Sequence, residues 1–326
     1  MADYVLNDSP EDCISSLSFH PTNPEVLLAT SWDKIGRVYD VGANVMMKAS
    51  RLSKGALLSG CFSSTGEHAF MGGLDCNLYQ KLYFVFVKYT DRWDIGGNEY
   101  SIGEHKEAIS SLAFNLSTNL LLSGSWDKTI GVWDHQAPSP LVEKLQLENN
   151  EKVYAISTAS TLLAVSTSNR QILVYDLRNR SVPLISKQSM LKFPTRTIEL
   201  FPNAAGIIYT SIEGRVAVEN FDKPELNYAF KCHRKPNSLV PSIDNDAENE
   251  VVDLVYSVNA TCFHPIYNTF VTGGSDGGVN CWDFVNKKRL KVFGSWNNGI
   301  SALSYNKNGD LLAIGNSYTF DQGDKP

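Results

Sequence analysis

The chain has 326 residues, of which 43% are hydrophobic and 20% are charged, so it is long enough to bury a sizeable core. Its formal net charge of −6 argues against bulk electrostatic binding to nucleic acid, and we expect no direct nucleic-acid partner. The N-terminus lacks a basic start followed by an apolar core, and no run of 18 apolar residues occurs. We therefore expect neither a signal peptide nor a membrane partner.

A strand–turn–strand pattern recurs along the chain. Its clearest copy, 121–134, reads LLSGSWDKTIGVWD, in which an apolar strand is followed by a tight turn at Asp127 and an alternating strand. A single hairpin cannot bury its faces alone, so it needs neighbours of the same kind. In chain order, a short strand at 4–6 is followed by units at 14–39, from 56 onward, and at 105–134, 153–177, 195–220, 260–284 and from 300 onward.

The turns of these units recur at a nearly constant spacing. Their turn residues are at positions 33, 75, 127, 169, 213, 276 and 318, in steps of 42, 52, 42, 44, 63 and 42 residues. Units of about 42 residues whose third strand ends in Trp-Asp resemble the WD-repeat family. This resemblance implies an all-β fold, a seven-bladed WD-repeat β-propeller with four strands per blade, formed by residues 1–326 as a single domain.

Three stretches depart from the repeat. The step of 52 predicts an insertion at 81–92 in the third strand of blade two, before Trp93-Asp94; it is either an unspliced coding segment or a natural hairpin extension, and sequencing the transcript separates the two. The step of 63 predicts an acidic loop at 235–255. The last blade is expected to be incomplete, with 4–6 supplying one of its strands and its C-terminal strand missing.

No residue pattern indicates catalysis or a metal site. The chain contains no H-E-x-x-H, G-x-S-x-G or Walker-type motif, and the prominent Asp residues are explained as turn residues. Its six cysteines form no C-x-x-C pair, so we expect reduced thiols and no zinc site. Cys232 next to His233 is interpreted as a buried thiol beside a surface imidazole. The prediction is a non-enzyme without cofactors.

Two groups of residues are candidates for binding. Trp32 and Trp126 each precede a turn Asp, which places them at the rim of the ring, where they could anchor a peptide or pack against the next blade. The second group is basic and lies in blade five and the connection after it. It fits an acidic or phosphorylated peptide, or a set of ordinary surface ion pairs. Its members are Arg196, Arg215, Lys231, His233 and Arg234.

Several longer stretches resemble one subfamily. SIEGRVAVE, AFKCHR, NTFVTGGSDGGVNCWD and SPEDCISSLSFHP are similar to the BUB-family mitotic checkpoint WD-repeat proteins and to their relatives, the mRNA export factors of the nuclear pore. SWD at 31–33 and GGLD at 72–75 favour the checkpoint branch. In this family the His before a blade commonly bonds the turn Asp, so His105 and Asp127 are expected to form a structural pair.

The resemblance also implies a function and partners. It implies a non-catalytic spindle assembly checkpoint adaptor that binds GLEBS-type motifs of checkpoint kinases through Trp32, Trp126 and Arg196. It implies that Arg215 and Arg234 bind phosphothreonine in a kinetochore scaffold, with the mitotic checkpoint complex as a further partner. The expected location is the nucleus and, in mitosis, the kinetochore, with the cytoplasm also open. The alternatives are a nuclear-pore mRNA export factor and a substrate receptor of a ubiquitin ligase.

Overall fold

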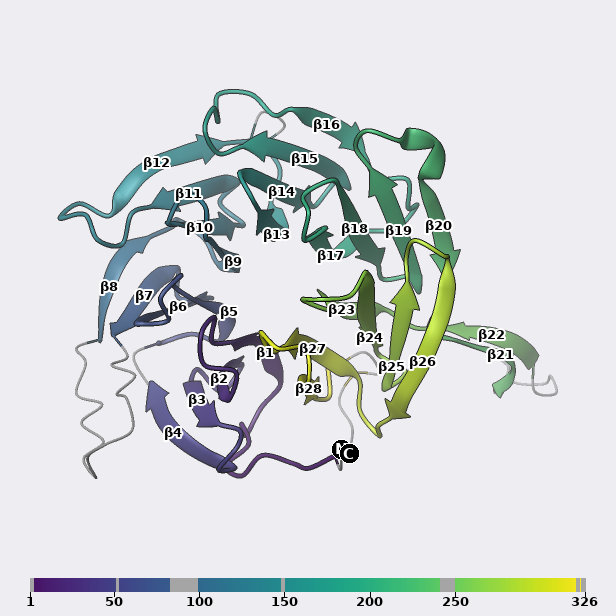
Figure 1. Ribbon diagram of the computed structural model, residues 1–326. Coiled ribbons are helices and arrows are strands. Elements are labelled where there is room, and N and C mark those ends of the chain that lie inside the picture. Colours follow the sequence, from purple (N-terminus) through teal and green to yellow (C-terminus); the bar gives the residue numbers. More distant parts are fainter. Residues whose placement is uncertain are drawn as a thin grey trace.

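The strands of the protein form a ring of antiparallel sheets. The structure is a computed structural model that describes residues 3–50, 53–82, 99–147, 150–240, 250–320 and 323. The first strand of each sheet in the ring faces the centre, and the later strands follow outward (Figure 1). Neighbouring sheets contact each other through these first strands, and β1 (Ile14–Phe19) contacts β27 (Ile300–Tyr305), which closes the ring.

Six sheets have four strands each and are the blades of the ring. Blade one contains β1, β2 (Val26–Ser31), β3 (Gly36–Asp40) and β4 (Val45–Ser50); blade two contains β5 (Leu57–Phe62), β6 (His68–Gly73), β7 (Asn77–Leu82) and β8 (Glu99–Glu104). Blade three contains β9 (Ile109–Asn115), β10 (Leu120–Ser125), β11 (Thr129–Trp133) and β12 (Leu141–Gln146); blade four contains β13 (Val153–Ala159), β14 (Leu162–Thr167), β15 (Gln171–Asp176) and β16 (Ile185–Gln188). Blade five contains β17 (Thr195–Leu200), β18 (Gly206–Ser211), β19 (Arg215–Asn220) and β20 (Tyr228–Lys231), with the 3-10 helix η1 (Pro224–Leu226) before β20; blade six contains β23 (Val258–Phe263), β24 (Thr269–Gly274), β25 (Gly278–Asp283) and β26 (Lys288–Ser295).

The prediction of an all-β WD-repeat propeller is confirmed, but the prediction of seven blades is wrong. The described part of the chain contains six four-stranded blades. The seventh repeat supplies only β27 and β28 (Leu312–Asn316), which pair from Ile300↔Asn316 to Tyr305↔Leu312. The turn spacing counted this repeat as a blade because the spacing registers the first two strands and their turn, whereas a blade also needs the third and fourth strands.

The N-terminal segment differs from its prediction. Residues 4–6, expected to be a strand of the last blade, form no strand. The Tyr4 hydroxyl instead donates to the Val41 carbonyl oxygen at 2.6 Å, and Leu6 packs against the apolar cluster that includes Leu27 and Tyr39. These contacts attach the segment to blade one.

The other two irregular stretches are partly described. β7 continues to Leu82, so the first two residues of the predicted insertion at 81–92 belong to the third strand of blade two. Residues 83–92, Trp93 and Asp94 lie outside the described residues. Where the sequence predicted an acidic loop at 235–255, β21 (Arg234–Val240) and β22 (Glu250–Val255) form a separate two-stranded hairpin, and 241–249 lie outside the described residues.

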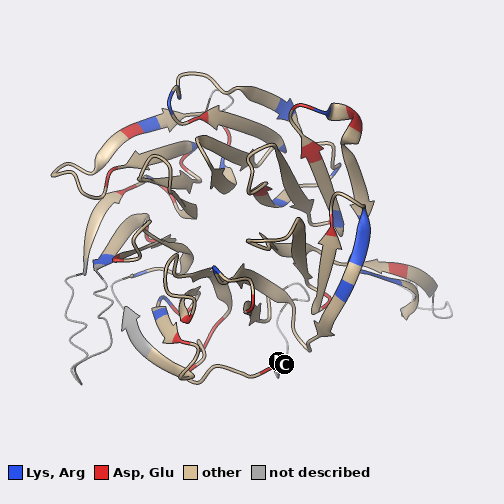
Figure 2. Cartoon of the chain, viewed as in Figure 1, with Lys and Arg blue, Asp and Glu red and all other residues tan. Residues whose placement is uncertain are grey.

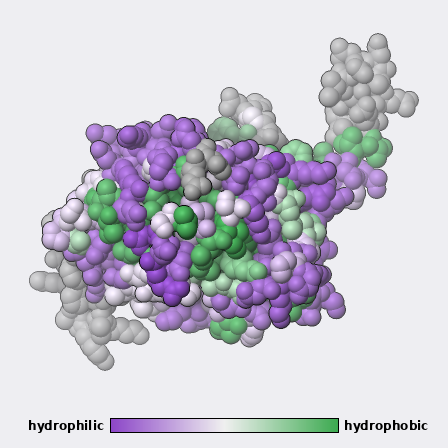
Figure 3. Space-filling view, turned by 90° about the horizontal axis from the view of Figure 1, so that it is seen from above, coloured by the Kyte–Doolittle hydropathy of each residue, from purple (hydrophilic) through white to green (hydrophobic). Residues whose placement is uncertain are grey.

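The hydrophobic core lies between neighbouring blades. Phe70 and Leu78 of blade two pack with Ile109, Leu121 and Trp133 of blade three, and similar clusters join the other blades. The second strands of the blades are nearly continuous apolar or small runs, because they are covered on both faces. The fourth strands are far more exposed, and Figure 3 shows hydrophobic side chains among hydrophilic ones on the rim of the ring.

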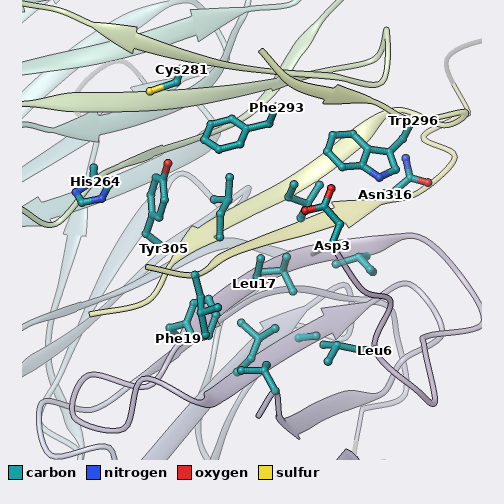
Figure 4. A pocket seen from close by; sticks show the side chains of 18 of the residues that line it. Asp3, Leu6, Leu17, Phe19, His264, Cys281, Phe293, Trp296, Tyr305 and Asn316 are labelled. Carbon is teal, nitrogen blue, oxygen red and sulfur yellow. The ribbon is translucent and has the colours of Figure 1, made fainter. Parts of the chain in front are cut away.

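A cavity of about 1770 Å³ lies on the open side of β28. It is lined by the N-terminal segment, by β28 and by parts of blades one and six, and Figure 4 shows Leu17, Phe293, Trp296 and Tyr305 around it. None of the predicted binding residues lines this cavity. Nowhere in the described ranges is a helix long and apolar enough to cross a membrane.

Candidate peptide-binding face

One face of the ring carries the turns between the second and third strands, and we call it the turn face. A backbone hydrogen bond ties these turns to the start of the first strands: Trp32 N–H donates to the Cys13 carbonyl oxygen at 2.9 Å, and Trp126 N–H to that of Ala108 at 3.0 Å. All five predicted binding residues lie on the turn face, because Arg196 is at the start of β17, Arg215 at the start of β19 and Arg234 at the start of β21.

A buried hydrogen-bond network supports the turn that carries Trp126. The Trp133 indole N–H donates to Ser123 Oγ at 2.7 Å, and Ser123 Oγ lies 2.7 Å from His105 Nε2. Because a carboxylate can only accept, His105 Nδ1–H donates to Asp127 at 2.9 Å. Nε2 of the neutral imidazole is then the acceptor for the Ser123 hydroxyl. The expected structural pair of His105 and Asp127 is therefore present.

The charge state of this network follows from its surroundings. Burial would raise the pKa of Asp127, but hydrogen bonds from Thr129, the Lys106 N–H and His105 lower it to about 2. Burial lowers the pKa of His105, and the carboxylate of Asp127 opposes that shift. At neutral pH the network therefore consists of a carboxylate and a neutral imidazole, which fits the hydrogen-bond directions.

Blade six contains the same network, and this corrects the interpretation of His233. The Trp282 indole N–H donates to Thr272 Oγ1 at 2.9 Å, Thr272 Oγ1 lies 2.8 Å from His233 Nε2, and His233 Nδ1 lies 2.8 Å from Asp276. His233 is buried, so it is neither a surface residue nor a member of the basic cluster. Its neighbour Cys232 is buried as expected.

Apolar side chains are exposed at several turns of the turn face. Trp32 is 45% exposed, and Trp126 is partly buried, with Lys152 Nζ 5.4 Å from the centre of its ring. Leu74 and Ile212 occupy the equivalent position in blades two and five and are 37% and 46% exposed. Neither residue was among the predicted binding residues, because the prediction was restricted to tryptophans. Their position directly before a turn residue is the signal that could have identified them.

Arg196 projects from the second position of β17 on the same face. The residues packed around it lower its pKa, and Cys13, at the start of blade one, opposes this shift. No described residue forms an ion pair with Arg196, which leaves its charge available to a ligand.

Arg215 and Arg234, which we call the arginine pair, lie around the carboxylate of Glu213. Arg215 Nε lies 3.3 Å from Glu213 Oε2, and Arg234 Nη2 lies 3.5 Å from Glu213 Oε1. Arg234 Nη2 also donates to the Glu213 backbone carbonyl oxygen at 2.9 Å. The structure thus brings together the two residues predicted to bind phosphothreonine, with the exposed Lys231 and Lys235 next to them in the chain.

The side chains on this face have the chemistry of a ligand-binding surface. The turn face combines exposed apolar side chains with Arg196, whereas the arginine pair offers guanidinium donors that suit a carboxylate or phosphate. Figure 2 shows further basic residues on β21 and along the outer strand β26. Within the described residues, no group of three or more His, Cys, Asp or Glu side chains could hold a metal ion.

Comparison with known proteins places these features in a family. The sequence profile described as WD domain, G-beta repeat matches residues 4–40, 96–134 and 253–283. The mitotic checkpoint protein BUB3.1 of Arabidopsis thaliana is 39% identical over 98% of this chain and 88% of its own length. The chain belongs to the WD-repeat family of the BUB3 mitotic checkpoint proteins.

Other members of the BUB3 family are similar over the same length. The mitotic checkpoint protein bub3 of Dictyostelium discoideum is 35% identical over 99% of this chain and 91% of its own length. The related poly(A)+ RNA export protein of Schizosaccharomyces pombe is 34% identical over 98% of this chain and 86% of its own length. The match to the WD-repeat profile and the similarity to BUB3 proteins point to a non-catalytic scaffold protein.

Proposed function

We propose that the protein is a spindle assembly checkpoint adaptor. It binds GLEBS-type motifs of checkpoint kinases with Trp32, Trp126 and Arg196, and it binds phosphothreonine of a kinetochore scaffold with Arg215 and Arg234. The observation that carries this proposal is that these five residues, far apart in the sequence, lie on one face of the ring. The identity with BUB3 checkpoint proteins over nearly the whole chain supports it.

The chemistry of the two groups fits these roles. The exposed Trp32, the partly buried Trp126 and the guanidinium of Arg196 on the same face suit an extended motif that carries apolar and acidic residues. A phosphate carries about −1.5 to −2 charges and three acceptor oxygens, which suits two neighbouring arginines. The working location of such an adaptor is the nucleus and, in mitosis, the kinetochore.

Affinity purification from dividing cells tests the proposal. We expect the protein to recover checkpoint kinases, mitotic checkpoint complex components and a phosphorylated kinetochore scaffold, with recovery of the scaffold lost after phosphatase treatment. Purification of no kinetochore component from mitotic cells would contradict the adaptor role.

Export of mRNA is the second candidate function. It is favoured by the 34% identity with the poly(A)+ RNA export protein and the 32% identity with the mRNA export factor GLE2 of Chaetomium thermophilum. Recovery of a nuclear-pore protein that bears the same extended motif, in place of kinetochore components, would support this function. Recovery of a ligase adaptor instead would indicate a substrate receptor of a ubiquitin ligase.

A further inference from the structure

The carboxylate of Glu213 already occupies the space between the two guanidinium groups of the arginine pair. Each of its oxygens faces a different arginine, at 3.3 Å for Arg215 and 3.5 Å for Arg234. Both distances exceed the 2.7–2.9 Å typical of a charge-assisted hydrogen bond. The contact is therefore an ion pair in which the guanidinium donors keep capacity for another acceptor.

Glu213 is well placed to compete with an incoming anion. It lies in the turn between β18 and β19. Its backbone N–H donates to Ser211 Oγ at 3.3 Å, and this hydrogen bond restrains the backbone of the turn. Its carboxylate is consequently held next to the arginines at a high effective concentration, as for any group linked within one molecule. A ligand must therefore bind the arginines more strongly than this internal carboxylate does in order to displace it.

The charges of ligand and competitor decide the outcome. The arginine pair carries two positive charges, and Glu213 neutralises one of them. A carboxylate ligand has the same charge as Glu213 and gains little from replacing it. A phosphate, with about −1.5 to −2 charges and three acceptor oxygens, binds both arginines more strongly than one carboxylate does.

We propose that Glu213 is an internal competitor for the arginine pair: it weakens the binding of every anion, so that a phosphate dianion still binds and a carboxylate does not. The inference rests on the proposed phosphothreonine-binding function and predicts that an Asp or Glu in the ligand does not substitute for the phosphorylated residue. The alternative is that Glu213 only holds the arginine side chains in place. Its removal would then weaken phosphate binding.

Three forms of one scaffold peptide test the inference, with phosphothreonine, glutamate or unmodified threonine at the same position. Their affinities are measured by fluorescence anisotropy for the unaltered full chain and for Glu213→Gln, which keeps the shape of the side chain and removes its charge. Glu225→Gln, which changes an exposed residue in η1 before β20, is the matched control for net charge.

For Glu213→Gln we expect the affinities for the glutamate peptide and for the phosphothreonine peptide both to rise roughly tenfold, so that binding of the glutamate peptide becomes measurable. For Glu225→Gln we expect unchanged affinities. Unchanged affinities in Glu213→Gln, or weaker phosphothreonine binding in a variant that melts at the temperature of the unaltered protein, overturn the inference alone. If the unaltered protein does not prefer the phosphothreonine peptide to the threonine peptide, the proposed function fails first.

Discussion

The imidazole of His105 and the carboxylate of Asp127 lie 2.9 Å apart beneath the turn that carries Trp126. The acceptor role of Asp127 extends further, because its carboxylate also receives the N–H of Lys106 at 2.9 Å and the hydroxyl of Thr129 at 2.6 Å. One side chain thus satisfies donors from the start of blade three and from its turn. The position of the turn that carries Trp126 depends on this arrangement.

Replacement of Asp127 by alanine should destabilise the protein strongly. The change leaves the buried imidazole of His105, the partly buried hydroxyl of Thr129 and the Lys106 N–H without their acceptor. We expect the free energy of unfolding to fall by about 2–4 kcal/mol. Urea denaturation followed by tryptophan fluorescence measures the effect. As a control, Asp134→Ala in the same blade removes one exposed hydrogen bond, to Gln136 N–H, and should cost less than about 1 kcal/mol. Equal losses of unfolding free energy in the two variants would show that the network stabilises the protein no more than one exposed hydrogen bond does.

The histidines between blades two and three should make stability depend on pH. The ring centres of His68 and His135 are 5.1 Å apart, and burial lowers the pKa of both; His68 lowers that of His135 further, while Glu67 and Asp134 oppose these shifts. Because the folded pKa values lie below the unfolded value near 6.5, the unfolded chain binds more protons below that pH. The stabilisation is therefore complete above about pH 6.5 and is lost as the pH falls through the folded pKa values. We expect a lower urea midpoint at pH 5.5 than at pH 7.5.

A single substitution separates this pair from the other titrating groups. His135 Nδ1 has no hydrogen-bond partner among the described residues, and the ring packs against Phe70 and Phe114. His135→Phe should therefore fold and should reduce the difference in urea midpoint between pH 7.5 and 5.5. If the difference stays as large as in the unaltered protein, the acid sensitivity originates elsewhere.

The ability to predict these features from sequence depended on how far apart the partners lie in the repeat. His105 and Asp127 belong to one unit and could be paired by resemblance, whereas β21 and β22 intervene between His233 and Asp276, which are 43 residues apart. The grouping of Arg215 with Arg234 was predicted, but the shared carboxylate of Glu213 was not, since alternation in a strand does not determine the direction of a side chain in a turn. Turn spacing located the repeats, but it could not show that residues 4–6 pack against blade one and add no strand to the seventh repeat.

Removal of the arginine pair should separate the two proposed binding activities. In Arg215→Ala with Arg234→Ala, we expect the affinity for the phosphothreonine peptide to fall at least tenfold and the affinity for the unphosphorylated kinase motif to stay unchanged. Titration calorimetry measures both. Replacement of Lys288 and Arg289 on the outer strand β26 by alanine removes the same charge from an exposed surface and should change neither affinity by more than about twofold. Equal loss of both ligands in the arginine variant would contradict the assigned roles.

Substitution of the tryptophans on the turn face should have the opposite selectivity. Trp32 and Trp126 project from turns whose backbones are tied to Cys13 and Ala108, so truncation of either ring removes contact surface without disturbing the turn. For Trp32→Ala and for Trp126→Ala, we expect the affinity for the kinase motif to fall by about 2 kcal/mol, the loss typical of a central aromatic anchor, and phosphothreonine binding to persist. Leu116→Ala is the matched control, because this exposed apolar residue follows β9 on the opposite face of the ring. The turn face would not be the motif-binding surface if kinase-motif binding persisted in both tryptophan variants. The same conclusion would follow if binding fell equally in the Leu116 variant.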